Sequence, residues 1–255
     1  MIGSVQKATK ILNVISEGKN SPVSLMDISI ATGINKSTYS HIISTLAEEG
    51  YVKKISHSSG YVIGPAVFCL SRFGKYSDDF ISVCHPIIKW LHKKTKYTIV
   101  LAVIESGRRY TIDYIDIEQP LLPEASEIIP DNIYNTATGR IIMANMNSNE
   151  IKELYEKTEI LEKGNWENIE SLAELEKALS EIDKHGIVKT CRTENGNLLI
   201  GYAAAIFKYT KCVGAVGVAV SCPPEEYENF TEEENMIKNN ILKARAEINR
   251  RLKYS

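Results

Sequence analysis

Residues 24–63 have the sequence SLMDISIATGINKSTYSHIISTLAEEGYVKKISHSSGYVI and carry the strongest structural signal in the chain. Ser24, followed three residues later by Asp27, is a capping box that marks a helix start. Gly33 favours the end of this short helix, because glycine accepts the left-handed C-cap conformation. Asn35 is a good N-cap for a second helix. Two helices joined by a short turn with glycine are typical of a helix-turn-helix.

The second of these helices has two chemically different faces. Apolar residues at helical spacing predict a buried face made by Tyr39, Ile42, Ile43 and Leu46. The opposite face has small or cationic hydrogen-bonding side chains and no acid, namely Lys36, Thr38, Ser40, His41 and Ser44. A surface that lies against phosphates and base edges needs this composition. The alternative is that any small helical domain exposes a polar face.

A β-hairpin is predicted directly after the two helices. Strand-like runs cover 51–55 and 60–63, on either side of the polar turn 56–59. A hairpin in this place favours the winged variety of the helix-turn-helix. Gly64-Pro65 then ends the second strand and begins a helix, because proline is tolerated in a first helical turn. Residues 65–74 are therefore a candidate linker helix.

Size and composition indicate an ordinary globular protein with more than one domain. The chain has 255 residues, and a prior of about 150 residues per domain suggests two. Its hydrophobic content of 44% and charged content of 24% are typical of soluble proteins. We expect no transmembrane helix, since no apolar stretch reaches about 18 residues, and the N-terminus lacks the apolar core of a signal peptide. Five scattered cysteines without a CxxC pair suit the reduced cytoplasm.

Charge is distributed unevenly between the two parts of the chain. Residues 1–75 contain eight lysines and arginines and four acids, a net charge of +4. Residues 76–255 contain the remaining 22 basic and 28 acidic residues, a net charge of −6. The overall charge of −2 argues against indiscriminate nucleic-acid binding. A basic N-terminal module on an acidic body steers only that end toward a polyanion.

The pattern of the sequence changes near residue 78. Apolar periodicity predicts helices over 79–95, 138–144, 148–155, 171–185 and 231–252, the fourth ended by Gly186 and the last capped by Thr231 with Glu234. Apolar runs predict strands over 97–104, 110–117, 187–190, 200–207 and 213–220. A looser segment rich in proline and acids covers 118–132. Helices around a central antiparallel sheet make an α+β domain.

Five short stretches point together to a known family. The N-terminal three are TGINKST at 32–38, LAEEGYV at 46–52 and GYVIGP at 60–65. The C-terminal two are YNTATGR at 134–140 and the hairpin AAAIF…GAVGV at 203–218. Each is only moderately specific, but in this order and spacing they resemble the IclR family of bacterial transcription regulators. The fourth is similar to the Ala-x-Gly-Lys helix start of the family's effector domain. The resemblance covers nearly the whole chain.

The resemblance implies a domain organisation and a function. It implies a winged helix-turn-helix DNA-binding domain in 1–64, a linker helix in 65–77, and a GAF-like effector-binding domain with a central antiparallel sheet in 78–255. It also implies a transcriptional regulator that acts on a palindromic operator of double-stranded DNA as a homodimer or tetramer. A small-molecule effector would control it. We expect no cofactor and no bound metal.

The DNA contacts are expected on the second helix of the motif and on the wing. Helix 36–49 would enter the major groove with Lys36, Ser37, Thr38, Ser40 and His41. The wing would contact the backbone or the adjacent minor groove with Lys53, Lys54 and His57, and Lys7 and Lys10 are further candidates for phosphate contacts. The family commonly has proline at the position of Asn35 and arginine at that of His41. Histidine lacks the permanent charge and bidentate reach of arginine, so the operator is expected to differ from the usual ones.

The effector is expected to be an organic or aromatic acid. The helix start Ala137-Thr138-Gly139 would offer backbone N–H donors to its anion. Relatives that bind small acids imply further contacts near Thr190 or Cys191, at Gly201, and at Ala219 and Ser221. Of the last three positions only Ser221 keeps a polar side chain. This composition favours a larger or partly apolar ligand over a very small polar acid.

Structural alternatives accompany these assignments. Gly201 and Ala219 can be close-packed sheet positions, and Cys191 can be a buried small hydrophobe. Arg108-Arg109, near a hairpin turn, is expected to be a solvated charge pair rather than a phosphate clamp.

We expect no enzymatic activity. His185 and Cys191 are near in sequence, but their spacing does not force a nucleophile–base pair. His85 and His92 alone do not make a zinc site. The alternative function is a small-molecule-binding module whose N-terminal domain serves mainly assembly.

Overall fold

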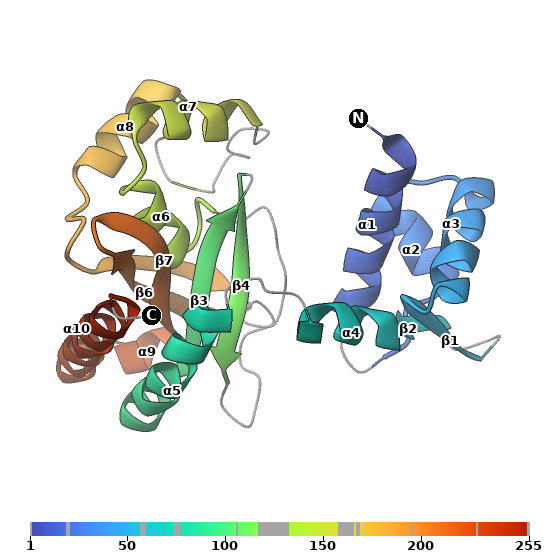
Figure 1. Ribbon diagram of the computed structural model, residues 1–255. Coiled ribbons are helices and arrows are strands. Elements are labelled where there is room, and N and C mark those ends of the chain that lie inside the picture. Colours follow the sequence, from blue (N-terminus) through green and yellow to red (C-terminus); the bar gives the residue numbers. More distant parts are fainter. Residues whose placement is uncertain are drawn as a thin grey trace. The chain divides into compact units, whose positions relative to one another are not determined.

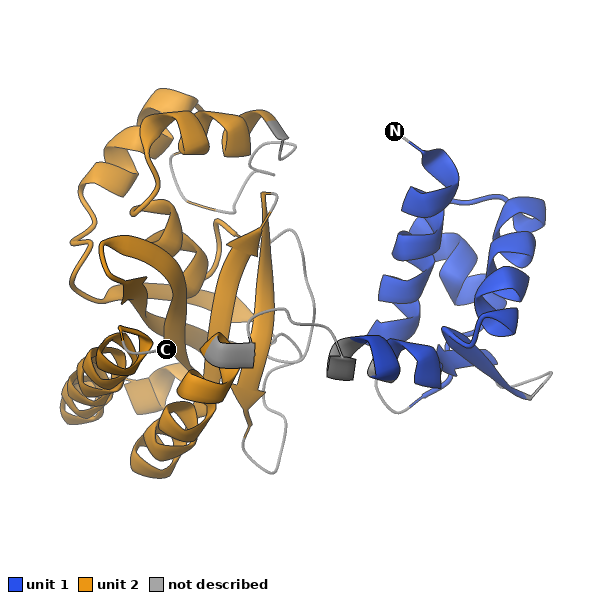
Figure 2. Ribbon diagram, in the orientation of Figure 1, with its two compact units in different colours: residues 1–76 blue, residues 77–255 orange. Residues whose placement is uncertain are grey.

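The computed structural model describes residues 2–18, 21–56, 60–73, 78–105, 107–116, 133–157, 166, 169–194, 196–227 and 229–253. The chain forms two compact units, Met1–Tyr76 and Ser77–Ser255 (Figure 2). The wing turn residue His57 and the predicted loose segment 118–132 lie outside the described residues. Within the described residues no helix has the length and apolar character needed to cross a membrane.

The N-terminal unit is a helix-turn-helix followed by a two-stranded wing. Its elements are α1 (Gly3–Glu17), α2 (Leu25–Thr32), α3 (Lys36–Glu48), β1 (Val52–Ser56), β2 (Gly60–Ile63) and α4 (Pro65–Phe73) (Figure 1). The two strands are antiparallel, with Lys53 opposite Val62. A core dominated by isoleucine joins the three helices to the wing and contains Ile11, Ile15, Ile28, Ile34, Tyr39, Ile43 and Val52.

Local capping chemistry explains why α2 and α3 begin and end where the sequence predicts. The Oγ of Ser24 accepts a hydrogen bond from the Asp27 N–H at 3.1 Å, and the Asp27 carboxylate accepts one from the Ser24 N–H at 3.3 Å. Gly33 ends α2 at φ 65°, in the left-handed region. The Asn35 Oδ1 then caps α3 by accepting from the Thr38 N–H at 3.0 Å. The turn geometry of the motif is thus encoded residue by residue.

The C-terminal unit is built on a five-stranded antiparallel sheet in the order β4-β3-β7-β6-β5. The strands are β3 (Thr98–Glu105), β4 (Arg108–Ile115), β5 (Val188–Glu194), β6 (Asn197–Lys208) and β7 (Lys211–Cys222). On one face lie α5 (Asp78–Thr95) and α10 (Thr231–Leu252), and side chains such as Ile88, Leu101, Tyr202 and Ile241 form the core between them. The confirmed class is α+β, as the sequence predicts.

The opposite face of the sheet is covered in part by α6 (Ala137–Met143), with α7 (Ser148–Lys157) and α8 (Leu172–Ser180) beyond it (Figure 1). Ala137 and Ile141 of α6 pack on Ala203, Ala205 and Ala215 of the central strands. Small residues on the sheet let this short helix approach closely. The N-terminal turn of α6 therefore lies over the middle of the sheet, where the candidate effector residues are.

Several predicted element boundaries are wrong. The last three strands extend well beyond 187–190, 200–207 and 213–220, because polar residues continue the alternation and pair across the β5–β6 and β6–β7 hairpins. α8 ends at Ser180, before the predicted end at Gly186. Thr231 does not cap α10: the N-cap is Phe230, without a side-chain cap, and it follows the short helix α9 (Pro224–Tyr227).

Candidate functional site

The candidate nucleic-acid surface is the outer face of α3. Tyr39 and Ile43 are buried against the domain core, while the predicted partners Ile42 and Leu46 are only half-buried. The outward face exposes Lys36, Ser37, Ser40, His41 and Ser44, and Thr38 is half-buried at its edge. Because the apolar side is fixed in the core, these outward side chains keep one orientation relative to the domain.

No acid interrupts this face of α3 over its first three turns. The first acid after it is Glu48, whose Oε1 accepts a hydrogen bond from the Ser44 Oγ at 3.2 Å. Hydroxyl donors and a lysine can reach phosphate oxygens and base edges, and acids on the same face would repel them. The surface is therefore chemically suited to a polyanion.

The wing adds exposed cations. Lys53 and Lys54 follow one another on β1, opposite Val62 and Tyr61, and both are exposed. The Lys54 Nζ lies 6.0 Å from the centre of the Tyr61 ring. Successive strand residues point to opposite sides, so the two lysines serve different sides of the wing.

A hollow of about 350 Å³ lies between α1 and the turn of the helix-turn-helix. Lys7 and Lys10 of α1 line one side, and residues 32–35 of the turn line the other. The sequence suggested both lysines as phosphate contacts. It did not show that the backbone of the turn would lie opposite them, because that approach depends on how α1 packs.

The predicted effector residues converge beneath the first turn of α6. Thr190, Gly201 and Ala219 lie side by side on β5, β6 and β7. A Cβ on Gly201 would lie 2.8 Å from the Thr190 Oγ1 and 3.3 Å from the Ala137 Cβ. A side chain here would crowd Thr190 on β5 and, less severely, Ala137 of α6, in agreement with the close-packing alternative. Ser221 stands two residues after Ala219 on β7, opposite Leu199, and therefore faces the same side of the sheet.

Cys191 does not lie with these residues. Alternation along β5 places it on the other face from Thr190, and its register partner Ile200 belongs to the core under α5 and α10. Its side chain is exposed, so the alternative of a buried small hydrophobe is wrong as well. Of the two predicted positions on β5, the structure brings only Thr190 to the candidate site.

The start of α6 offers fewer backbone donors than the sequence implied. The Thr136 Oγ1 caps the helix by accepting from the Gly139 N–H at 3.1 Å. Gly139 is needed for close packing instead, because a Cβ there would lie 2.0 Å from the Ile133 carbonyl oxygen. Ala137 and Thr138 are both buried in the same turn. Their N–H groups come before the first intrahelical hydrogen bond and so have no acceptor within the helix.

Arg109 was misjudged from the sequence. Arg108 is exposed as expected, but Arg109 is only 7% exposed and points to the α6 side of the sheet. Its Nε donates to the Thr138 Oγ1 at 2.8 Å. Burial lowers the pKa of Arg109 to about 10, so the side chain stays protonated at neutral pH. Side chains alternate between the two faces along β4, with Arg109 opposite Ile104. This alternation was the signal that could have distinguished the buried arginine from the exposed one.

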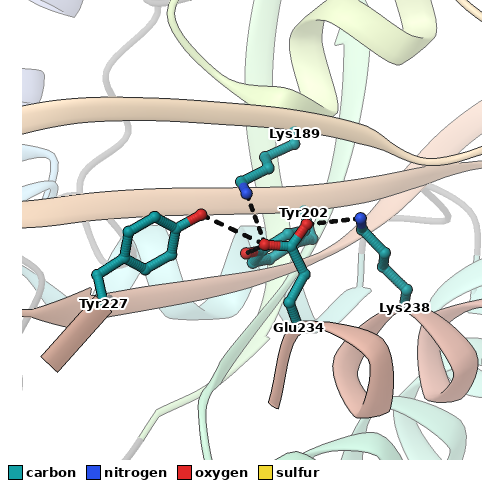
Figure 3. A network of polar contacts seen from close by, with 5 residues as sticks. All are labelled: Lys189, Tyr202, Tyr227, Glu234 and Lys238. Carbon is teal, nitrogen blue, oxygen red and sulfur yellow. Dashed lines mark hydrogen bonds and ion pairs between the residues drawn. The ribbon is translucent and has the colours of Figure 1, made fainter. Parts of the chain in front are cut away.

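A polar network fixes the edge strand β5 to α10 on the other side of the sheet (Figure 3). The Glu234 carboxylate accepts hydrogen bonds from the Lys189 Nζ at 2.6 Å, the Tyr202 hydroxyl at 3.0 Å and the Tyr227 hydroxyl at 3.3 Å, and pairs with Lys238. Burial alone would raise the pKa of Glu234, but these partners lower it to about 2. The sequence did not predict this network, because its members come from four separate elements.

The histidines do not form a catalytic or metal cluster in the described part of the chain. His85 Nδ1 lies 2.8 Å from Asp113, and His92 Nδ1 lies 2.8 Å from the Tyr97 carbonyl oxygen. His85 and His92 both belong to α5, but their side chains contact different groups and do not form one site. The His185 ring contacts that of Phe207, at 5.3 Å between centres. Among described residues no group of three or more metal-ligating side chains occurs.

Comparison with known proteins identifies the family. Residues 76–250 match the model of the bacterial transcriptional regulator IclR C-terminal domain, and residues 4–56 match the IclR helix-turn-helix domain. The chain belongs to the IclR family. The resemblance read from the sequence is thereby confirmed.

Individual IclR-family relatives are distant. Transcriptional repressor IclR of Escherichia coli is 21% identical over 155 residues, which are 60% of this chain and 56% of that protein. The HTH-type transcriptional regulator TtgV of Pseudomonas putida is 23% identical over 247 residues, which are 96% of this chain and 90% of that protein.

Solved IclR-family structures show the same fold. An IclR transcriptional regulator from Alicyclobacillus acidocaldarius has a TM-score of 0.72 at 18% identity, covering 98% of this chain and 99% of that chain. An IclR homologue from Microbacterium hydrocarbonoxydans, complexed with 4-hydroxybenzoate, has a TM-score of 0.72 at 14% identity, covering 99% of this chain and 100% of that chain.

Proposed function

We propose that this protein is a DNA-binding transcriptional regulator whose C-terminal unit binds a small-molecule effector. The observation that carries the proposal is the exposed, acid-free face of α3, with Lys36, Ser40 and His41 above buried Tyr39 and Ile43. Membership of the IclR family supports the same reading. The net charge of +4 on residues 1–75 favours contact between this unit and a polyanion.

In this proposal α3 lies in the major groove and the wing lies on the backbone or in the adjacent minor groove. Base edges and phosphates are divided among Lys36, Ser37, Thr38, Ser40 and His41 on α3, with Lys53, Lys54 and His57 on the wing. Lys7 and Lys10 line a hollow with the helix-turn-helix turn, which suits a backbone phosphate. The partner is double-stranded DNA with a palindromic operator, bound by a homodimer or tetramer in the cytoplasm.

The proposed effector is an organic or aromatic acid. The face beneath α6 has an apolar part, where Leu199 and Ala219 pack on Val100, next to the hydroxyls of Thr190 and Ser221. An apolar floor with few polar groups suits a partly apolar ligand. The 4-hydroxybenzoate complex of the Microbacterium hydrocarbonoxydans homologue supports this class. We propose ligand control without enzymatic activity.

Control is proposed to pass through α4. The Gly64 N–H donates to the Tyr51 carbonyl oxygen at 2.8 Å, and the Ala66 N–H donates to the Gly50 carbonyl oxygen at 3.1 Å. These bonds fix the start of α4 to the corner between α3 and the wing. A ligand that prefers one arrangement of two such units changes operator affinity by population shift, and a coupling of about 1–3 kcal/mol is typical.

The first test is a salt titration of DNA binding with a fragment from upstream of the gene. Lys36→Ala should lower affinity for all duplexes and flatten the slope of log affinity against log salt by about one. Lys211→Ala is the matched control, because it removes the same charge from the exposed first residue of β7 in the acidic unit. A slope equal to that of the control would remove Lys36 from the DNA contacts.

The alternative, an assembly role for the N-terminal unit, is favoured by apolar side chains exposed on α1 and α2. Met26 and Ile30 are each 71% exposed, and Val5 is 57% exposed. Substitution of Met26 and Ile30 by serine, followed by light scattering and gel shift, separates the two functions. Loss of oligomers with no operator shift in either protein would favour assembly alone.

A further inference from the structure

Arg109 is a buried cation to which the described residues supply no counter-charge. Its one hydrogen bond there joins its Nε to the neutral hydroxyl of Thr138, at 2.8 Å. By contrast, Arg192, Arg250 and Arg251 are each paired with a carboxylate. A buried charge without an opposite partner is costly, so proteins seldom retain one without a use.

We propose that Arg109 holds the anionic group of the effector and that the effector is a monoanion with an apolar body. This inference rests on the proposed effector-binding function and names its ligand class. The guanidinium fork presents parallel N–H donors, and a carboxylate accepts two of them at once. The buried arginine thus serves as a preformed counter-ion, and ligand binding removes the cost of its isolation.

A second polar group on the same strand, the hydroxyl of Thr111, is also buried. The Thr111 Oγ1 is buried and has no hydrogen-bond partner among the described residues. It stands two positions after Arg109 on β4, with only Tyr110 between them, so both side chains point to the α6 side of the sheet. Buried hydroxyls without partners are rare, and each requires an explanation. A ligand carboxylate has enough lone pairs to accept from Arg109 and from a threonine hydroxyl.

The hydrogen bond to Thr138 places the charged end of Arg109 at the candidate effector face. Thr138 lies over Gly217, where a Cβ would be 2.8 Å from the Thr138 Cγ2 and 3.2 Å from the Val100 Cγ2. The adjacent residue Ala137 lies over Gly201. A molecule held at Arg109 can therefore extend across the apolar floor around Val100.

The other charges on this face explain why one anionic group is preferred to two. Arg192 lies on the same face as Thr190, but it is already paired with Glu194 at 3.4 Å. Beside Ala219, its register partner Thr98 donates through Oγ1 to the Asp116 carboxylate at 2.6 Å. A second ligand carboxylate would meet neutralised or negative groups. A neutral ligand would supply no counter-charge to Arg109.

The test measures binding by calorimetry and thermal shift on the full chain. The probes are benzoate and 4-hydroxybenzoate as monoanions, benzamide as a neutral analogue and terephthalate as a dianion. We expect wild-type protein to bind a monoanion at least tenfold more tightly than benzamide or terephthalate. Arg109→Met should lose that preference and should bind the monoanions at least tenfold more weakly than wild type. Arg109→Lys should keep part of the preference. Arg108→Met is the matched control and should bind as wild type.

Ligand-free stability distinguishes a binding role from a structural one. Methionine replaces the aliphatic part of the arginine side chain and carries no charge, so Arg109→Met without ligand should melt at the wild-type temperature or above it. A melting temperature well below that of wild type and of Arg108→Met would overturn the inference, because the arginine would then be needed for the fold.

The remaining outcomes separate this inference from the proposed function. Binding of 4-hydroxybenzoate by Arg109→Met with wild-type affinity overturns the role of Arg109, and so does failure of wild type to bind either monoanion. In both cases a gel shift on the same samples still decides DNA binding. If the wild-type protein bound neither the acids nor DNA, the proposed function would be overturned as well.

Discussion

At the scale of single residues, His41 limits the permanent charge of the α3 face. It is exposed, one turn after Lys36 and Ser37, on the surface proposed to meet DNA. Arginine keeps its charge at any physiological pH and can bond phosphate or guanine with two parallel donors, whereas histidine is a single-point donor.

His41→Arg should therefore tighten binding to duplex DNA several-fold at neutral pH. It should also steepen the salt dependence by about 0.9 in the log–log slope, because one more counterion is released. Fluorescence anisotropy at several salt concentrations measures both. His185→Arg adds an arginine to an exposed site in the C-terminal unit and controls for net charge alone. Equal slopes for the two variants would place residue 41 away from the DNA.

The same scale shows what a sequence can and cannot predict about a site. Ser24, Gly33 and Asn35 were assigned correctly, because caps depend on residues within one turn of each other. Cys191 and Arg109 were not. Each points to the opposite face of its strand from its neighbour, Thr190 or Arg108, and the sequence does not show which neighbour takes which face. That choice depends on strand register, which is set by residues far away in the sequence.

At the scale of elements, α3 depends on its cap. The Asn35 Oδ1 satisfies the Thr38 N–H at 3.0 Å, and Asn35→Ala would leave that donor to water. We expect a loss of about 1 kcal/mol in the stability of the N-terminal unit. For a domain of this size, that corresponds to a fall of about 4–8 °C in melting temperature.

Differential scanning calorimetry of the full chain tests the Asn35 prediction. The matched control is Ser171→Ala, which removes the N-cap of α8 in the other unit. Asn35→Ala should lower only the transition of the N-terminal unit, and Ser171→Ala only that of the C-terminal unit. A shift of the same transition by both variants would contradict the prediction.

The polar network at Glu234 gives the C-terminal unit a specific acid sensitivity. Its pKa is lowered from 4.5 to about 2 by its hydrogen-bonded partners, against the opposing effect of burial. A carboxyl whose pKa is lowered by folding stabilises the fold above its ordinary pKa. That stabilisation is lost as the pH falls from about 4.5 toward 2.

Glu234→Gln should lower the melting temperature at pH 7 and flatten its fall between about pH 4.5 and 2. Glu247→Gln is a demanding control. Hydrogen bonds from Arg250 and Arg251 lower the pKa of Glu247 to about 2 as well, but that group lies nearer to solvent and is more strongly screened. An equal effect of the two variants would show that the network adds nothing beyond a surface ion pair.

Helices and strands were predictable from the sequence where the spacing of apolar residues clearly matched a helix or a strand. The long helices α5 and α10 and the succession of strands along the chain followed from apolar spacing, apart from their ends. The lengths of β5, β6 and β7 did not, because residues such as Arg192 and Glu194 look like loop residues until their pairing partners are known.

At the scale of the whole molecule, opposite charge separates the two tasks. In the proposed function, the basic residues of 1–75 would favour DNA and the acidic surplus of 76–255 would disfavour it, so electrostatics would help to turn the N-terminal end toward the duplex. Regulation then requires a connection that transmits the bound state. α4 is the last described helix before the C-terminal unit and is proposed as that connection; its start is hydrogen-bonded to Gly50 and Tyr51 beside α3.

Leu70→Pro tests whether α4 transmits the effector signal. Leu70 is 59% exposed within α4, so the substitution breaks helical hydrogen bonding with little loss of packing. Effector affinity and operator affinity without ligand should remain close to wild type, but the effector should no longer change operator affinity. Calorimetry with the acid and anisotropy with operator DNA, each with and without the other ligand, measure these quantities. Leu70→Ala keeps the helix and should keep the coupling; persistence of coupling in Leu70→Pro would mean that the signal passes outside α4.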